Sequence, residues 1–330
     1  MTQFPREFEL IFKENFRYLS DIDKVDRPLL AHYTSLEALE KIIKNESFLA
    51  SHPFVMNDTQ ELIFGLTISI QILDEFECDK KIIKMMGGKN YLTEICDEIY
   101  SNFDDFSNKY LNSTFVLSFS EHDEKQNPDG QLSMWRGYGA NGQGAALIFS
   151  SESFENNLSD FVFAKVNYGT DQNRKNLLRK FYKKIFTSFN PIYPKGKSIV
   201  IGVQIYFLTL SFSLLYKHTA FKEEKEWRLI YLPSSKEDKY HQKNQTYVIS
   251  KNTIQPRLNI DMRFYDSALD PDLGKIQRIK LPVHTILLGP THNSNLSLEA
   301  TKHMLTNLGK TNLINKLKAS TIPYRAQSRA

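Results

Sequence analysis

The feature that most constrains the fold is an uncharged, mainly apolar stretch at residues 199–216. A run of ~18 apolar residues can cross a bilayer as a helix, so the stretch is either a membrane anchor or a segment buried in the fold. Polar side chains interrupt it at positions 204, 209, 211 and 213. Such groups lack hydrogen-bond partners in lipid but find them in a protein core. We therefore expect a buried helix, or a helix that continues into a strand, and no membrane association.

The 330-residue chain shows no internal repeat and no Pro/Ser-rich linker, which favours one elaborated domain over residues 1–330. Helical and strand patterns are mixed along it, which indicates an α+β fold with helical insertions at about residues 59–110 and 171–216. The net charge of +4 is too small to identify a nucleic-acid-binding protein by itself. The first 14 residues carry five charges where a secretion signal needs an apolar run, so we expect a cytoplasmic protein.

Local patterns predict the individual elements. Apolar residues at helical spacing over 4–22 predict an amphipathic helix that packs on the body. Residues 29–33 resemble a strand, and Thr34-Ser35 offers an N-cap for a helix over 36–44. Asn57-Asp58 predicts a turn that caps the next helix. Further strands are expected at 47–50, 115–120, 145–149, the second half of 221–231, and 286–290, and a further helix at about 298–308.

The sequence lacks the motifs of several common chemistries. We find no phosphate-binding G-x-x-x-x-G-K-[ST] loop, no strand-linked G-x-G-x-x-G, no H-E-x-x-H and no G-x-S-x-G. The eight histidines do not pair at metal-ligand spacing. The two cysteines, Cys78 and Cys96, are too few for a zinc quartet. We therefore expect no bound metal.

Two segments have an unusual composition. In the charged segment 223–228, a strand conformation would place Glu224 and Glu226 on one face, where paired carboxylates can position a ribose hydroxyl and stabilise a developing cation. A solvated charged turn explains the same residues. The second segment carries Trp135 and Tyr138 among five of the chain's 14 glycines, and packing alone also accounts for these two aromatics.

The order of several short motifs resembles the bacterial family known as domain of unknown function 2971. The motifs are His-Tyr-Thr at 32–34, Asn-Asp-x-x-Glu at 57–61, Ser-Phe-Ser at 118–120, Trp-x-x-Tyr-Gly at 135–139, Glu-x-Glu-x-Arg at 224–228, Gly-Pro at 289–290 and Ile-Pro-Tyr-Arg at 322–325. They span nearly the whole chain. The family carries no established chemistry, so this resemblance implies no activity.

The motif order is also similar to that of NAD-dependent ADP-ribosyltransferases. That resemblance implies a central mixed or antiparallel split sheet, with His32 on the first strand and a catalytic Glu on a late strand. It implies a catalytic set of Glu226, Glu224 and His32, with Glu226 preferred. It implies an NAD-binding set of His32, Tyr33, Thr34, Ser118, Ser120, Trp135, Tyr138 and Arg228. The Trp135-x-x-Tyr138 motif has no fixed counterpart in that superfamily.

Under this resemblance the protein is an NAD-dependent ADP-ribosyltransferase or NAD glycohydrolase. Glu226 would hold the ribose 2′-hydroxyl and stabilise the oxocarbenium-like centre. His32 and Thr34 would hold the adenosine side, and Tyr138 or Trp135 would stack on nicotinamide. The glycines at 137, 139, 142 and 144 would admit the ligand to the backbone. The acceptor would be protein, nucleic acid or water, and such a toxic effector fits bacterial anti-phage defence.

Two other functions stay open on the sequence. The basic segment 171–187 bears Arg174, Lys175, Arg179, Lys180, Lys183 and Lys184. Clustered cations of this kind can follow a phosphate backbone, which indicates a nucleic-acid-binding or nuclease-like module. A solvated helix face explains them equally well. The third function is a non-catalytic regulatory protein of a defence system that acts through partner proteins of its operon.

Overall fold

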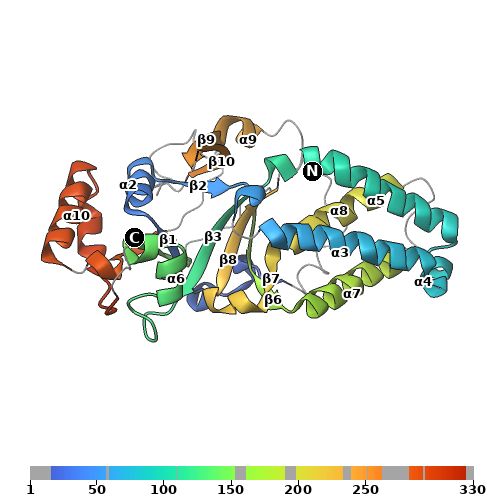
Figure 1. The fold of residues 1–330 in the computed structure, drawn as a ribbon, viewed down its shortest axis with the longest axis horizontal. Coiled ribbons are helices and arrows are strands. Elements are labelled where there is room, and N and C mark those ends of the chain that lie inside the picture. Colours follow the sequence, from blue (N-terminus) through green and yellow to red (C-terminus); the bar gives the residue numbers. More distant parts are fainter. Residues whose placement is uncertain are drawn as a thin grey trace.

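The computed structural model describes residues 16–56, 59–109, 111–152, 161–189, 198–232, 239–250, 252–261, 282–292 and 294–324. The molecule is elongated (Figure 1). A twisted sheet occupies its centre, a bundle of long helices extends from one end of the sheet, and helix α10 (Asn295–Asn307) lies at the other end. The fold is therefore mixed α+β, as predicted.

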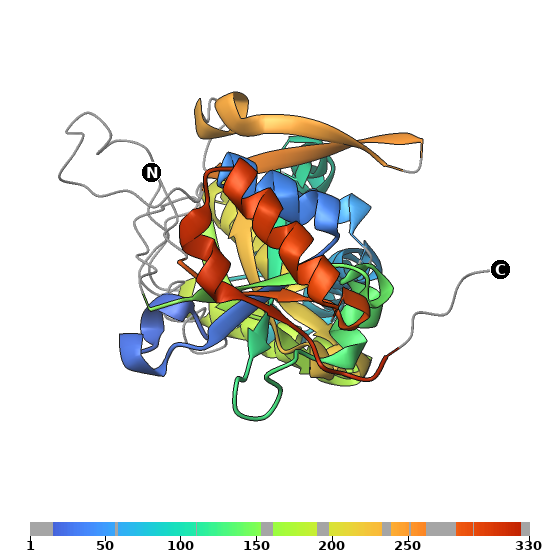
Figure 2. The same cartoon turned by 90° about the vertical axis from the view of Figure 1, so that its left-hand side faces the viewer.

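Within the described residues, the central sheet has ten strands and is open and mixed. Its strands are β1 (Leu29–Thr34), β2 (Ser47–Ser51), β3 (Phe115–His122), β4 (Ala145–Ser150), β5 (Phe161–Lys165), β8 (Glu226–Tyr231), β9 (Gln245–Ser250), β10 (Thr253–Asp261), β11 (Val283–Leu288) and β12 (Leu317–Ala319). Neighbours pair antiparallel except β11 and β12, which are parallel. The β9–β10 ribbon crosses the top of the molecule in Figure 2.

The sheet divides at β3. Strand β8 pairs along one edge of β3 over Phe115–Ser120. The other edge is shared, because β1 pairs there through Ala31 and Ser120 while β2 pairs through Ser51 and Val116. Strands β1 and β2 then part, and each continues into its own half of the sheet, β4–β11–β12 or β10–β9. The opening between them lies beside the middle of β3.

Separate apolar clusters cover the faces of the sheet. The bundle comprises α3 (Thr59–Cys78), α4 (Lys80–Met85), α5 (Lys89–Lys109), α7 (Asp171–Phe189) and α8 (Ser198–Leu215), and its core includes Val116, Ala164 and Ile230 of the sheet. A second cluster joins the opposite face to α2 (Leu36–Asn45) and α10. A small third cluster lies under α6 (Leu132–Gly137).

The uncharged stretch forms α8, followed directly by the short strand β7 (Tyr216–His218), which pairs with β6 (Asn167–Gly169). Its described side chains from position 205 onward are buried among α3, α5 and α7. The hydroxyl of Thr209 donates to Ile205 O at 2.8 Å, and that of Ser213 donates to Thr209 O at 2.8 Å. The prediction of a buried helix running into a strand is confirmed. No helix in the described ranges combines the length and apolarity that crossing a membrane requires.

The predicted amphipathic helix over 4–22 is wrong where it can be seen. Residues 1–15 lie outside the described residues, and 16–22 are not α-helical. Tyr18 forms a bridge with Ala164, and Lys165 N donates to Arg17 O at 2.9 Å, so this segment runs beside β5. The apolar spacing that suggested a helix places Phe16, Leu19 and Ile22 in the core.

Other local predictions hold. Ser35 caps α2, since its side chain accepts from Ala38 N at 3.2 Å. The helical insertion predicted at about 59–110 is present as α3, α4 and α5, with the double glycine at 87–88 between α4 and α5. Each predicted strand is present within a few residues of its expected bounds. The predicted turn at Asn57-Asp58 lies outside the described residues, and α3 begins directly after it.

Candidate functional site

A cavity of about 260 Å³ opens at the division of the sheet, on the face toward α6. The candidate residues that line it are His32, Tyr33, Ser118, Ser120, Tyr138, Glu224 and Glu226. They come from β1, β3, the end of α6 and the start of β8, which are remote in sequence. The geometric expectation that His32, Tyr138 and Glu226 share one cleft is confirmed.

His32 lies where β1 leaves β3. Its Nδ1 is 3.1 Å from Ser118 O, and its ring packs edge-on against Phe48 and Phe119. Burial lowers the pKa of His32, although the bond to Ser118 O opposes this. The imidazole is therefore neutral near pH 7. Because a carbonyl only accepts, Nδ1 carries the hydrogen and Nε2 is left as an acceptor.

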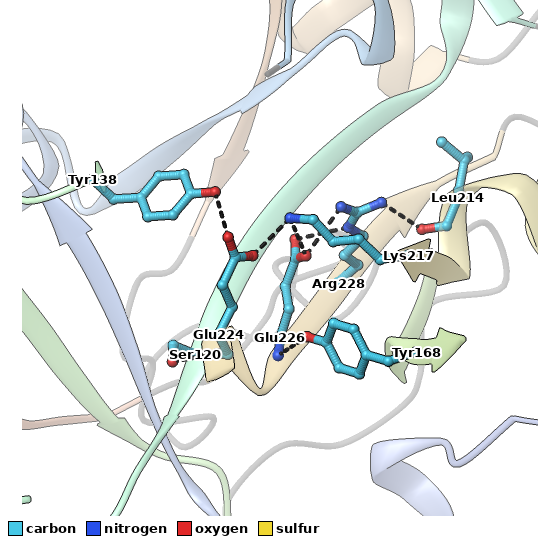
Figure 3. A network of polar contacts seen from close by, with 8 residues as sticks. All are labelled: Ser120, Tyr138, Tyr168, Leu214, Lys217, Glu224, Glu226 and Arg228. Carbon is cyan, nitrogen blue, oxygen red and sulfur yellow. Dashed lines mark hydrogen bonds and ion pairs between the residues drawn. The ribbon is translucent and has the colours of Figure 1, made fainter. Parts of the chain in front are cut away.

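The two carboxylates converge by a route that the strand pattern did not predict. Glu224 ends a 3₁₀ helix (Thr219–Glu224), and Glu226 begins β8. Lys225 between them is left-handed, with φ of 45°, and this turn brings both acidic side chains to the same side (Figure 3). The expectation of two neighbours on one strand face is thus wrong in its geometry, although both carboxylates line the cavity.

Glu226 is held in a buried ion pair (Figure 3). Arg228 donates to both of its oxygens, from Nε at 2.7 Å and from Nη2 at 3.0 Å. The Lys217 ammonium lies 3.4 Å from Oε2. Burial pushes the pKa of Glu226 upward, but the two cations outweigh it and the pKa lies below its ordinary value. Glu226 is therefore a fixed anion that orients the two cations.

Glu224 has a different environment. Lys217 donates to its Oε2 at 2.6 Å, and the Tyr138 hydroxyl donates to its Oε1 at 3.0 Å. Ser120 fixes its backbone by donating to Glu224 O at 2.6 Å. Burial is the largest influence and raises the pKa of Glu224, with Lys217 opposing it. A carboxyl group with a raised pKa is suited to exchange a proton near neutral pH.

Sequence reasoning missed Lys217, whose ammonium bonds both carboxylates. The residue is fully buried, on the strand that follows α8. With Glu224, Glu226 and Arg228 it forms a cluster of two anions and two cations, hereafter the ion cluster. The sequence did contain a signal for this residue, since Lys217 directly follows the long uncharged stretch. A cation at the end of a buried segment is itself buried and needs an acidic partner.

Three predicted ligand-binding residues do not line the cavity. Trp135 is fully buried, donates from Nε1 to Asp129 O at 2.9 Å, and packs at right angles on Tyr33. Arg228 lies behind Glu226 and donates to Leu214 O at 2.7 Å. Trp135 is thus a packing residue, and Arg228 acts through Glu226. Thr34 lines a second hollow, which shares His32 and Leu49 with the cavity wall.

The glycines were expected to admit a ligand, and the structure shows a different use. A Cβ on Gly139 would meet Trp135, one on Gly144 would meet Thr34 O, and one on Gly142 would meet the ring of Tyr324. None of these glycines lines the cavity. They allow close packing of the segment that carries Tyr138.

At least half of the cations of the basic helix α7 interact with other residues of the protein. Arg174 is buried, pairs with Asp171 and lies over the ring of Phe64. Lys175 and Arg179 both pair with Glu75 of α3. The remaining three cations, Lys180, Lys183 and Lys184, are exposed. Arg174, Lys175 and Arg179 therefore serve packing and ion pairs within the helical bundle, which weakens the case for a nucleic-acid-binding function.

Among the described residues, no group of three or more His, Cys, Asp or Glu could hold a metal ion. Comparison with known families finds one match. Residues 134–229 match the family described as "Protein of unknown function (DUF2971)". The matched segment includes Tyr138 and the whole ion cluster, so it supports the first family resemblance at the site itself. Comparisons with curated proteins and with solved structures found no match, and nothing in them supports the resemblance to ADP-ribosyltransferases.

Proposed function

We propose that the cavity binds NAD and that the protein breaks the nicotinamide–ribose bond, as an ADP-ribosyltransferase or NAD glycohydrolase. The observation that carries the proposal is the meeting of a neutral histidine and two carboxylates at one cavity, where strands β1 and β2 part. Such a site offers an acceptor for ribose hydroxyls and negative charge for an oxocarbenium-like centre.

The geometry favours Glu224 over Glu226 as the group that meets the ribose. Both oxygens of Glu226 accept from the Arg228 guanidinium, whereas Glu224 shares its oxygens between Lys217 and Tyr138. This reverses the order expected from the resemblance. Glu226 then keeps Lys217 and Arg228 in place, and Tyr138, with 38% of its surface exposed, offers a ring on which nicotinamide can stack.

In the proposed step, the bond from ribose C1′ to the nicotinamide nitrogen breaks, and its electron pair stays on nicotinamide. An acceptor oxygen or nitrogen bonds to C1′ and passes its proton to the Glu224 carboxylate. His32 Nε2 accepts from a ribose hydroxyl. The Ser118 hydroxyl lines the cavity and also interacts with the Glu226 carboxylate, so a ligand group that meets Ser118 also lies beside Glu226.

The test is release of free nicotinamide from NAD by the purified protein, with and without cell extract as a source of acceptors. We expect Glu224→Gln to lower the rate about 10²–10³-fold, the usual effect of removing one preorganised electrostatic group. Glu223→Gln is the matched control, since Glu223 is exposed and does not line the cavity. No release by the wild type under either condition refutes the proposal.

The cellular setting belongs to the same proposal. An enzyme that consumes NAD or modifies cellular molecules harms its own cell, so we propose a cytoplasmic effector of bacterial anti-phage defence. Induced expression of the wild type should stop growth, and Glu224→Gln should restore it. Toxicity that survives this substitution while nicotinamide release is lost would assign the growth arrest to something other than the cavity.

A further inference from the structure

The second hollow lies on the far side of His32 from the ion cluster. It measures about 500 Å³ and is lined by parts of α2, β2, β10, the start of β9 and the end of α9 (Lys239–Asn244). It shares His32 and Leu49 with the cavity. The two hollows therefore adjoin at these two residues.

The chemistry of this hollow differs from that of the cavity. Lys41 of α2 and Lys243 of α9 line it, and no described residue of its wall is Asp or Glu. Neither lysine makes a hydrogen bond or an ion pair with another described residue, whereas Lys175 and Lys217 do. Two cations that face one hollow without acidic partners give it a positive potential, which suits an anionic ligand.

An unsatisfied amide adds an independent observation. Asn259 of β10 lines the hollow, and its Oδ1 is buried without a hydrogen-bond partner among the described residues. A buried acceptor of this kind costs about 1–3 kcal/mol unless a donor reaches it. Phosphate oxygens only accept, so they cannot serve Oδ1, whereas an amino group or a sugar hydroxyl can. The ligand therefore carries both an anion and a donor.

We propose that this second hollow binds the phosphate groups of a nucleotide, with Lys41 and Lys243 as their partners and Asn259 accepting from the base or sugar. The nucleoside diphosphate part would sit here, and the rest of the ligand would extend past His32 into the cavity. Only this last placement rests on the function proposed above. Binding of the nucleotide itself stands on the second hollow alone.

The test is calorimetric titration of the full chain with ADP, adenosine and inorganic pyrophosphate. We expect ADP to bind at least tenfold more tightly than either fragment. The double variant Lys41→Ala/Lys243→Ala should weaken ADP binding at least tenfold, and its affinity should depend less on salt. Lys44→Ala is the control, because Lys44 is exposed on the same helix and lies outside the wall.

Each outcome bears on the inference. Adenosine binding as tight as ADP excludes the phosphate contacts, and pyrophosphate binding as tight as ADP excludes the nucleotide. An equal loss of ADP affinity in Lys44→Ala would show that ADP does not bind in the second hollow. ADP binding that needs the two lysines, in a protein that releases no nicotinamide, supports this inference and ends the transferase proposal. Nicotinamide release that is indifferent to both lysines would support the transferase proposal and end the placement of the nucleoside diphosphate part of NAD in this hollow.

Discussion

Nδ1 of His32 lies 3.1 Å from the carbonyl oxygen of Ser118, at the place where β1 and β2 separate along β3. One side-chain contact therefore spans a gap in the backbone pairing of the sheet. It holds the imidazole between the cavity and the second hollow, with Nε2 as a free acceptor. A protonated imidazole could make the same contact, so it is burial that lowers the pKa of His32 and favours the neutral ring.

This burial makes stability depend on pH. The pKa of His32 lies below its ordinary value of 6.5, so the unfolded chain binds a proton that the folded chain does not. Stability should be full above pH 6.5 and fall as the pH drops below it. Chemical denaturation of the wild type and His32→Gln at pH 7.5 and 5.5 isolates the effect from that of His122, whose pKa is also lowered. An identical acid loss in both proteins would contradict it.

The ion cluster should be sensitive to the loss of a single charge. Glu226→Gln leaves Lys217 and Arg228 buried with one carboxylate between them, and breaking a buried pair typically costs about 3–5 kcal/mol. Although Gln has nearly the shape of Glu, these contacts predict a clear loss of stability. Glu223→Gln, at an exposed position, should leave the denaturation midpoint unchanged.

A second substitution separates charge balance from shape. Arg228→Met in the Glu226→Gln background removes the cation that has lost its carboxylate and leaves Lys217 paired with Glu224. We expect the double variant to be more stable than Glu226→Gln alone, because fewer buried charges are unpaired. If it is less stable, the packing of Arg228 and not its charge determines the loss.

Two glycines of one short segment should respond in opposite ways. Gly142 has φ of +81°, and a Cβ there would come within 2.8 Å of the Tyr324 ring, so Gly142→Ala should destabilise by about 1–3 kcal/mol. Gly137 ends α6 and has open space around it, so Gly137→Ala should be neutral or stabilise by about 0.5–1 kcal/mol. Thermal unfolding of the two variants compares them directly.

The same packing explains the C-terminal motif. Thr321 donates to the Asp129 carboxylate from both N and Oγ1, at 2.9 and 2.7 Å, and Tyr324 contacts Asn141 and Gly142. Residues 320–324 thus hold the segment that carries Tyr138. The motif resemblance included this tail but gave it no role. Its role could not be read from the sequence, because its partner Asp129 lies almost 200 positions earlier.

Local rules account for much of the fold, since Ser35 caps its helix and the uncharged stretch becomes α8. Strand spacing drew attention to the two carboxylates, whereas the motif resemblance drew attention to His32. Local rules could not identify Lys217 as a site residue, because its role depends on tertiary contacts with two carboxylates. They misjudged residues 16–22, where pairing with β5 overrides helical spacing. They assigned Trp135 and the glycines to a ligand because close packing and close approach of a ligand favour the same residues.

The final prediction concerns Tyr138, whose hydroxyl donates to Glu224 Oε1 at 3.0 Å. This bond favours the ionised carboxylate and lowers the pKa of Glu224 against the effect of burial. Tyr138→Phe keeps the ring but removes the donor, so the pKa of Glu224 should rise further. If Glu224 is the base that takes a proton from the molecule that bonds to ribose C1′, the acidic limb of the pH–rate profile for nicotinamide release must move to higher pH.

Tyr247→Phe is the matched control, since Tyr247 is 64% exposed on β9 and lies outside the cavity wall. Its pH profile should coincide with that of the wild type. A Tyr138→Phe profile that keeps its acidic limb while the rate falls uniformly would limit Tyr138 to stacking on the ligand. A profile whose basic limb, and not its acidic limb, moves to higher pH would mean that Glu224 acts in its protonated form, because a raised pKa keeps that form populated to higher pH.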